Sequence, residues 1–116
     1  MPLVRVPFAR MSIPVELGNL ADEIARYGEA AYVLTVGDDD RVHVAHERVR
    51  VEGAVLRARA GRTTRANVAI HPTVTLLWPP VEPGGMSLIV DAEAFESGAE
   101  DDLHLAPKGA VLHRPA

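Results

Sequence analysis

The 116-residue sequence contains no cysteine, and this absence removes several classes of chemistry at once. Disulfide bonds, thiolate nucleophiles and zinc sites built on sulfur are excluded. Aromatic residues make up only 4% of the chain, so a stacking surface for single-stranded nucleic acid is not expected. The glycine-rich patterns GxxxxGK[ST] and GxGxxG are also missing, which argues against a P-loop triphosphatase and against a Rossmann dinucleotide site.

The sequence also lacks a long apolar run. The first 18 residues carry prolines at positions 2, 7 and 14 together with Arg5 and Arg10, so they resemble neither a signal peptide nor a membrane span. We therefore expect a cytoplasmic protein with no membrane contact. Proline at this spacing disfavours a helix, so residues 1–18 are expected to form an extended arm on a single domain that covers residues 1–116.

Basic residues, in contrast, are concentrated in one stretch. Six of the 12 lysines and arginines fall between positions 48 and 65, where they meet a single acidic residue, Glu52. This stretch carries a charge of +5, and because the whole chain carries −4, the remainder carries −9. Such a pattern is more typical of a site for a small phosphate-bearing ligand than of a nucleic-acid surface.

The pattern of apolar and turn residues predicts a mainly β domain. A short amphipathic helix is expected over residues 20–27, begun by Asn19 and ended by Gly28. A second helix is expected to run to Ile70, with one of the threonines at positions 63 and 64 as its N-cap. We expect these elements to complete a Greek-key-like antiparallel barrel. Its strands are predicted over residues 31–36, 41–51, 54–60, 73–78, 86–95 and 102–106.

The valines of the second predicted strand change phase along its length. Val42 and Val44 are separated from Val49 and Val51 by an odd number of positions, so the two sets cannot share a face of a regular strand. We therefore expect a β-bulge near residues 45–47.

A two-residue turn at Glu52-Gly53 is expected to join this strand to the next one. That turn places Arg48 opposite Arg57, and alternation along the strands then gathers four arginines on one face: Arg48, Arg50, Arg57 and Arg59. Arginines that face one another across a ladder destabilise it by up to about 1 kcal/mol unless an anion or a carboxylate lies between them. The face is therefore predicted either to hold a negative partner or to point its charges into solvent.

The following helix adds a second preference for anions. Thr63, Thr64 and Arg65 lie at its predicted N-terminus, where free backbone N–H groups and the helix dipole favour a phosphate. Hydroxyl and guanidinium groups add directed donors. We therefore predict that the arginine face and this helix start together bind a phosphate group. The predicted binding residues are Arg48, Arg50, Arg57, Arg59, Thr63, Thr64 and Arg65.

Two segments carry a family resemblance. The run Thr64-Arg65-Ala66-Asn67-Val68 and the run Ile70-His71-Pro72-Thr73-Val74 match the pattern "Ser/Thr, Lys/Arg, x, Asn, hydrophobic" followed by "hydrophobic, x, Pro, x, Val". In this order, after a hairpin and a strand, they resemble the pyridoxamine 5′-phosphate oxidase-like proteins with the FMN-binding split barrel. The resemblance covers about residues 31–95.

The resemblance implies a cofactor site and an assembly. Thr64 and Arg65 would bind the FMN phosphate, and Arg57 or Arg59 would supply a second basic contact. The flavin of such proteins lies in a groove between the two subunits of a homodimer, where it touches hairpin backbone that corresponds to residues 46–50. Some members use a deazaflavin or have lost the cofactor, so a deazaflavin or no cofactor are the alternatives to FMN.

Other candidate chemistry is limited. His43 and His46 form an HxxH pair, but residues three apart on a strand face opposite sides, which disfavours a metal site. The acidic run at 38–40 is expected to be a solvated turn, and Trp78 a core residue. The segment His113-Arg114 could cap the site of a partner subunit or be a free polar tail.

No Ser-His-Asp set and no pair of carboxylates stands out, so any catalysis would have to come from a cofactor. The sequence thus predicts a flavin- or deazaflavin-dependent oxidoreductase of unknown substrate. The alternative is a non-catalytic module that binds a flavin or another phosphate ligand, or a cofactor-less split-barrel dimer. A nucleic-acid-binding barrel is disfavoured by the net charge of −4.

Overall fold

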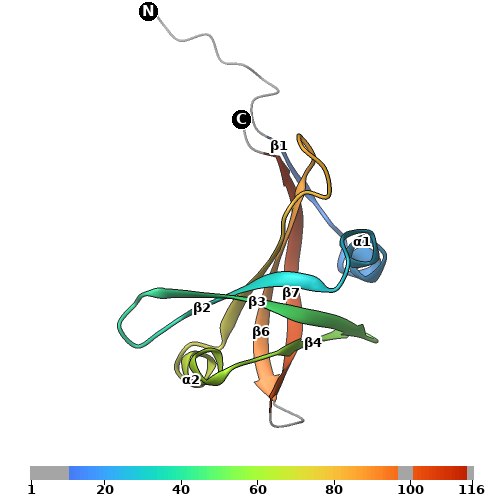
Figure 1. Ribbon diagram of the computed structural model, residues 1–116. Helices are drawn as coiled ribbons and strands as arrows, with labels where there is room; N and C mark the ends of the chain where they lie inside the picture. Colours follow the sequence, from blue (N-terminus) through green and yellow to red (C-terminus); the bar gives the residue numbers. More distant parts are fainter. Residues whose placement is uncertain (1–10, 97–100, 115–116) are drawn as a thin grey trace, which may run out of the picture.

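The computed structural model describes residues 11–96 and 101–114 (Figure 1). Seven strands, two α-helices and one 3-10 helix (η1) make up this part of the chain. The elements are, in order, β1 (Met11–Pro14), η1 (Leu17–Asn19), α1 (Leu20–Tyr27), β2 (Ala30–Val36), β3 (Val42–Glu52), β4 (Val55–Arg59), α2 (Arg62–Ile70), β5 (Thr73–Trp78), β6 (Ser87–Glu96) and β7 (Asp102–Arg114).

Six of the strands close into an antiparallel barrel, as the sequence predicts. The sheet order is β1-β7-β4-β3-β2-β5-β6, and β6 pairs back onto β7 to complete the circle. The 13-residue β7 makes this closure possible, because it pairs with β6 on one side and with both β4 and β1 on the other. Each of these six strands therefore has a partner strand on both sides over at least part of its length.

Alternation along the strands fills the barrel with apolar side chains. In β2, Ala31, Val33 and Thr35 point inward and are at most 1% exposed, while their neighbours are partly exposed. The largest apolar side chains with under 2% exposure come from six strands: Trp78, Leu56, Leu76, Leu88, Leu105, Val33, Val49, Val74 and Val90. Burying each such side chain contributes about 1.5–3 kcal/mol.

The two helices lie against the barrel (Figure 1), and a side-chain hydrogen bond attaches each of them. Helix α1 ends at Gly28, whose φ of 96° suits glycine, and the indole Nε1 of Trp78 donates to the Gly28 carbonyl at 2.9 Å. Helix α2 is attached by a buried bond in which Asn67 Nδ2 donates to Thr35 Oγ1 at 3.1 Å. Trp78 is 1% exposed, so the prediction of a core residue is confirmed.

The predicted turn of the β3–β4 hairpin is wrong by one residue. Glu52 pairs with Val55 and Arg50 pairs with Arg57, so Gly53 and Ala54 form the two-residue loop. Gly53 has a φ of 63°, which matches a type II′ turn with glycine at its first central position. In the predicted turn, glycine takes the second central position instead. A loop shift of one residue moves the register by two, so the four arginines still share a face.

The predicted bulge near residues 45–47 is also wrong. Strand β3 pairs with β2 without interruption from Arg48 opposite Ala30 to Val42 opposite Val36. The change of phase among the valines has a different cause, because Val42 and Val44 face outward and are 61% and 52% exposed. Val49, at 1% exposure, points into the barrel.

Three further boundaries differ from the predictions. The N-cap of α2 is Gly61, so Thr63 and Thr64 lie inside the first turn. Strand β7 continues well past residue 106, because Pro107 lies next to a register shift against β6, where a missing N–H is tolerated. In the predicted N-terminal arm, residues 11–14 form β1 on β7, and residues 1–10 lie outside the described part of the chain.

Candidate functional site

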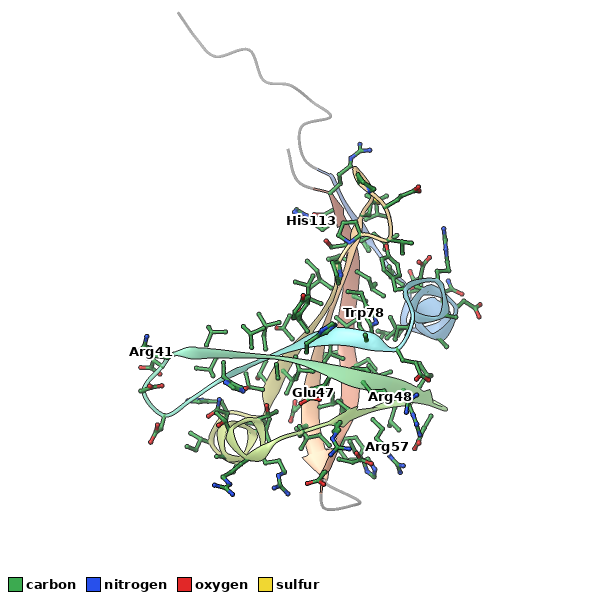
Figure 2. The ribbon with its side chains drawn as sticks, in the orientation of Figure 1. Arg41, Glu47, Arg48, Arg57, Trp78 and His113 are labelled. Carbon is green, nitrogen blue, oxygen red and sulfur yellow. The ribbon has the colours of Figure 1, made fainter. Side chains whose placement is uncertain are left out.

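The outer face of the β3–β4 hairpin gathers the predicted arginines. Arg50 lies directly opposite Arg57, while Arg48 and Arg59 extend the same face by one more position on each strand. Figure 2 shows Arg48 and Arg57 at the same end of the hairpin, far along β3 from Arg41. The prediction that these four side chains share a face is confirmed.

The four arginines enclose a hollow of about 150 Å³, with Asp102 as the fifth residue of its wall. A neighbouring hollow of about 420 Å³ shares Arg48 and Arg59 with it and continues over the outer face of β2 and β3. The remaining wall of this second hollow consists of Glu29, Ala30, His46 and Glu47. We call the two connected hollows the arginine groove.

Carboxylates balance part of the positive charge. Arg48 Nε lies 2.7 Å from Glu29 Oε1, and Arg57 Nη2 lies 3.3 Å from Glu52 Oε1. Among the residues that the structure describes, Arg50 and Arg59 form no ion pair. Exposed ion pairs of this kind contribute about 0–1 kcal/mol each, so an incoming anion can compete with them at low cost.

Arg57 has the most constrained surroundings of the four. Its Nε is buried and has no hydrogen-bond partner within residues 11–96 and 101–114, because the carboxylate of Asp102 is 3.7 Å away. On the neighbouring strand, His104 pairs with Arg57 in register, and its Nε2 lies 3.5 Å from Arg57 Nη2. A buried donor without an acceptor costs about 1–3 kcal/mol, so this site favours an added acceptor such as a phosphate oxygen.

The predicted residues at the start of α2 lie beside the groove and do not line it. Thr63 is exposed, and Thr64 is buried at 1% exposure. Arg65 Nη1 lies 4.0 Å from Asp101 Oδ1. The helix nevertheless begins only three residues after Arg59, and its N-cap, Gly61, has no side chain that could cap the first-turn N–H groups.

Two acidic residues of the site, Asp102 and Glu29, and the neighbouring His104 are absent from the sequence prediction. Asp102 and His104 come from β7, which pairs with β4 across more than 40 residues of sequence, and Glu29 precedes β2. No local pattern announces such neighbours. The sequence indicates such neighbours only indirectly, because arginines that face one another across a ladder need a carboxylate or an anion between them.

The outer surface next to the groove is apolar and carries two stacked rings. Tyr32 and His46 lie opposite each other in the β2–β3 ladder, with ring centroids 4.5 Å apart and planes inclined by 18°. Beyond them, outward-facing side chains of four strands form a partly exposed surface that we call the apolar stripe. Its members are Leu34, Val42, Val44, Leu77 and Ile89.

Other predicted features have little chemistry. Residues 38–40 form an exposed turn, in which Asp39 accepts a hydrogen bond from the Arg41 backbone N–H at 3.1 Å. Within the described ranges, no group of three His, Asp or Glu side chains is placed to hold a metal ion. His113 Nδ1 and Ser12 Oγ are 3.0 Å apart on the β1–β7 pair. None of the helices in the described part is long and apolar enough to span a membrane.

Comparisons with known proteins bear on the same fold. No protein-family profile matches the chain. The "Uncharacterized protein Mb0449c" of Mycobacterium bovis is 42% identical over 117 residues, which cover 88% of this chain and 82% of that protein. "Uncharacterized protein MT0457" of Mycobacterium tuberculosis matches to the same extent.

Solved structures match at low identity but high coverage. A Listeria innocua protein, provisionally named pyridoxamine 5′-phosphate oxidase, superposes with a TM-score of 0.70 at 16% identity, over 84% of this chain and 98% of that one. An FAD-binding protein of Mycobacterium smegmatis gives 0.63 at 15% identity, over 89% and 98%. An F420 reductase gives 0.61 at 15% identity, over 77% and 94%. These similarities establish the fold.

Proposed function

The chain belongs to the family of the mycobacterial protein Mb0449c and has the split-barrel fold of pyridoxamine 5′-phosphate oxidase-like proteins, and from this we propose that it binds a phosphate-bearing flavin in the arginine groove. FMN is the first candidate, because it carries a single phosphate group. A deazaflavin is the alternative, since one structural neighbour is an F420 reductase.

The observation that carries this proposal is the hollow of about 150 Å³ with four arginines in its wall. Arg50 and Arg59, which have no ion pair among the described residues, are the side chains available to donate to phosphate oxygens. The buried Nε of Arg57 offers a further donor at the same place. Charge-assisted bonds of this kind are about twice as strong as neutral ones.

The rest of the groove suits a planar ring. The hollow of about 420 Å³ continues from the arginines toward His46, which is stacked on Tyr32. A flavin, when bound, supplies hydride or electron transfer, which matches the lack of an acid–base or nucleophile set in the sequence. The protein's own part is to hold the phosphate and orient the ring against this surface.

We also propose that the protein is a homodimer that associates through the apolar stripe. Val42 and Val44 are 61% and 52% exposed beside half-buried Leu34, Leu77 and Ile89. Contiguous apolar surface of this kind marks an interaction site. The stripe runs up to the Tyr32–His46 pair, so a second subunit placed on it would add a further wall to the arginine groove.

The visible absorption spectrum tests flavin binding. Protein that has been incubated with FMN and separated from free ligand is expected to retain the yellow flavin spectrum, and a parallel sample with a deazaflavin compares the two cofactors. A colourless protein in both samples would reject flavin binding and leave the cofactor-less barrel.

Turnover separates an oxidoreductase from a carrier. If the protein is an enzyme, reduced nicotinamide or a reduced deazaflavin is expected to bleach bound FMN faster than free FMN, because orientation and exclusion of water are what the protein adds. Tight FMN binding without faster bleaching by any reductant would support the alternative, a non-catalytic flavin-binding module.

A further inference from the structure

Among the described residues, Asp102 is the one acidic residue in the wall of the four-arginine hollow. It is the first residue of β7 and pairs in register with Arg59 of β4, so its position is set by the barrel closure. Its side chain lines the hollow and is 27% exposed, so the carboxylate remains partly in contact with solvent. The carboxylate thus lies beside the arginines that an anionic ligand in the hollow would contact.

The contact of Asp102 with Arg57 is an ion pair without a hydrogen bond. Asp102 Oδ2 lies 3.7 Å from Arg57 Nε, which is beyond hydrogen-bond distance and leaves this buried N–H with no acceptor among the described residues. Glu52 Oε1 already contacts Nη2 of the same guanidinium at 3.3 Å. An anion with an oxygen closer to Nε would therefore gain a bond that Asp102 does not make.

The effect of the Asp102 carboxylate on an anionic ligand depends on the net charge of the hollow. Arg48 is engaged by Glu29 at 2.7 Å and Arg57 by Glu52, so Arg50 and Arg59 carry most of the uncompensated charge. The carboxylate of Asp102 offsets part of this positive charge and repels any other anion that enters the hollow. Like charges a few ångströms apart near a protein surface repel one another, and solvent weakens this repulsion for partly exposed groups.

We propose that Asp102 is an internal competitor for the anionic group of the ligand. It compensates the arginines when the hollow is empty, and it yields its place when a phosphate-sized anion binds. Asp102 thereby lowers the affinity of the site and restricts it to ligands whose anion makes several hydrogen bonds at once. The inference rests on the proposed anion-binding function of the arginine groove.

Sulfate is a suitable probe, because it has the size of phosphate and keeps its double charge at neutral pH. Calorimetric titrations of sulfate into the full chain and into Asp102→Asn are expected to give about three- to tenfold tighter binding to the variant, as removal of one repulsive charge predicts. Asp91→Asn removes an equal charge on the outer face of β6, where Asp91 contacts Thr75, and is expected to leave sulfate affinity unchanged.

A stability readout follows the same competition. In sulfate-free buffer, Asp102→Asn is expected to melt at a lower temperature than the wild type, because the arginines lose a counter-charge, and sulfate is expected to restore it. Weaker or equal sulfate binding by Asp102→Asn, an equal gain in Asp91→Asn, or no sulfate binding by either protein would overturn the proposal. A parallel FMN titration separates this proposal from the proposed flavin binding. If FMN binds but Asp102→Asn does not change sulfate affinity, only the competing role of Asp102 is refuted. If Asp102→Asn binds sulfate more tightly but FMN does not bind, only flavin binding is refuted.

Discussion

Arg57 and Arg59 lie two residues apart on one face of β4, yet their surroundings differ. Arg57 contacts Glu52, Asp102 and His104, so removing its charge would leave two carboxylates uncompensated. Arg59 pairs in register with Asp102 but forms no ion pair within the described residues. Arg59 is therefore the better residue for testing ligand binding separately from stability.

Arg59→Gln is expected to weaken FMN binding by about 1.5–3 kcal/mol, the value of a charge-assisted hydrogen bond. The free energy of unfolding is expected to change by no more than about 0.5 kcal/mol, because no carboxylate is left without a partner. Calorimetry and chemical denaturation measure the two quantities. Arg41→Gln, at the opposite end of β3, is the matched control, and equal loss of affinity in both variants would refute a localised site.

Tyr27 is expected to make the stability of the protein depend on pH. Its hydroxyl donates to the Met86 carbonyl at 2.8 Å. Burial raises the pKa of Tyr27 above its ordinary value of 10.0, and the charge of Glu23 adds to the rise while Arg26 opposes it. A raised pKa means that the folded state holds the proton more tightly, so this stabilisation is complete below pH 10 and is lost as pH rises through the folded-state pKa.

Tyr27→Phe removes both the hydrogen bond and the titration. The variant is expected to be about 1 kcal/mol less stable than the wild type near neutral pH, because the Met86 carbonyl loses its donor. The difference is expected to shrink above about pH 10, where the wild type alone loses the contribution of this group. Denaturant unfolding at several pH values measures it, and a constant difference across the range would contradict the assignment.

At the scale of elements, the β3–β4 hairpin connects the sequence pattern to the site. Glycine at position 53 adopts a φ of 63°, and the turn it forms sets Arg50 opposite Arg57. Misplacing the turn by one residue shifts the strand register by two. Side-chain alternation also has a period of two, so the predicted arginine face is unchanged. The bulge prediction failed because it treated all four valines of β3 as core residues, although two of them face outward.

Gly53→Ala is expected to destabilise the protein by about 1–2 kcal/mol, because an L-residue is strained in this backbone conformation. Gly109→Ala in β7 serves as a control, since its φ is not positive and a Cβ there would meet no atom within 4 Å. Thermal or denaturant unfolding measures both. Equal effects of the two substitutions would show that the turn conformation at Gly53 is not the cause.

At the scale of the whole molecule, closure of the barrel brings together residues that local sequence patterns do not connect. The antiparallel barrel, most strand positions and the arginine face follow from alternation and turn residues, and the split-barrel family follows from the resemblance of the motif after β4. The acidic residues around the arginines do not follow, because Asp102 and Glu29 reach them only through pairing of distant strands. The length of β7 was also missed, since Pro107 and Gly109 normally interrupt a strand and here lie beside a register shift.

The apolar stripe predicts the oligomeric state. Sedimentation at micromolar concentration is expected to give twice the chain mass, and Val44→Asp is expected to shift the protein to monomer by placing a charge on the stripe. Val81→Asp, on a loop where Val81 is 71% exposed, is expected to leave the dimer intact. A wild-type monomer that still binds flavin would contradict the proposed interface.

The central claim is that the arginine groove holds the phosphate of a flavin. Titration of the wild-type protein with FMN and with riboflavin, under identical conditions, tests it most directly, because the two ligands share the ring and differ in the phosphate. FMN is expected to bind at least about tenfold more tightly, as loss of a charge-assisted hydrogen bond to the arginines requires. Equal affinity for the two ligands, or no binding of either, would contradict the account.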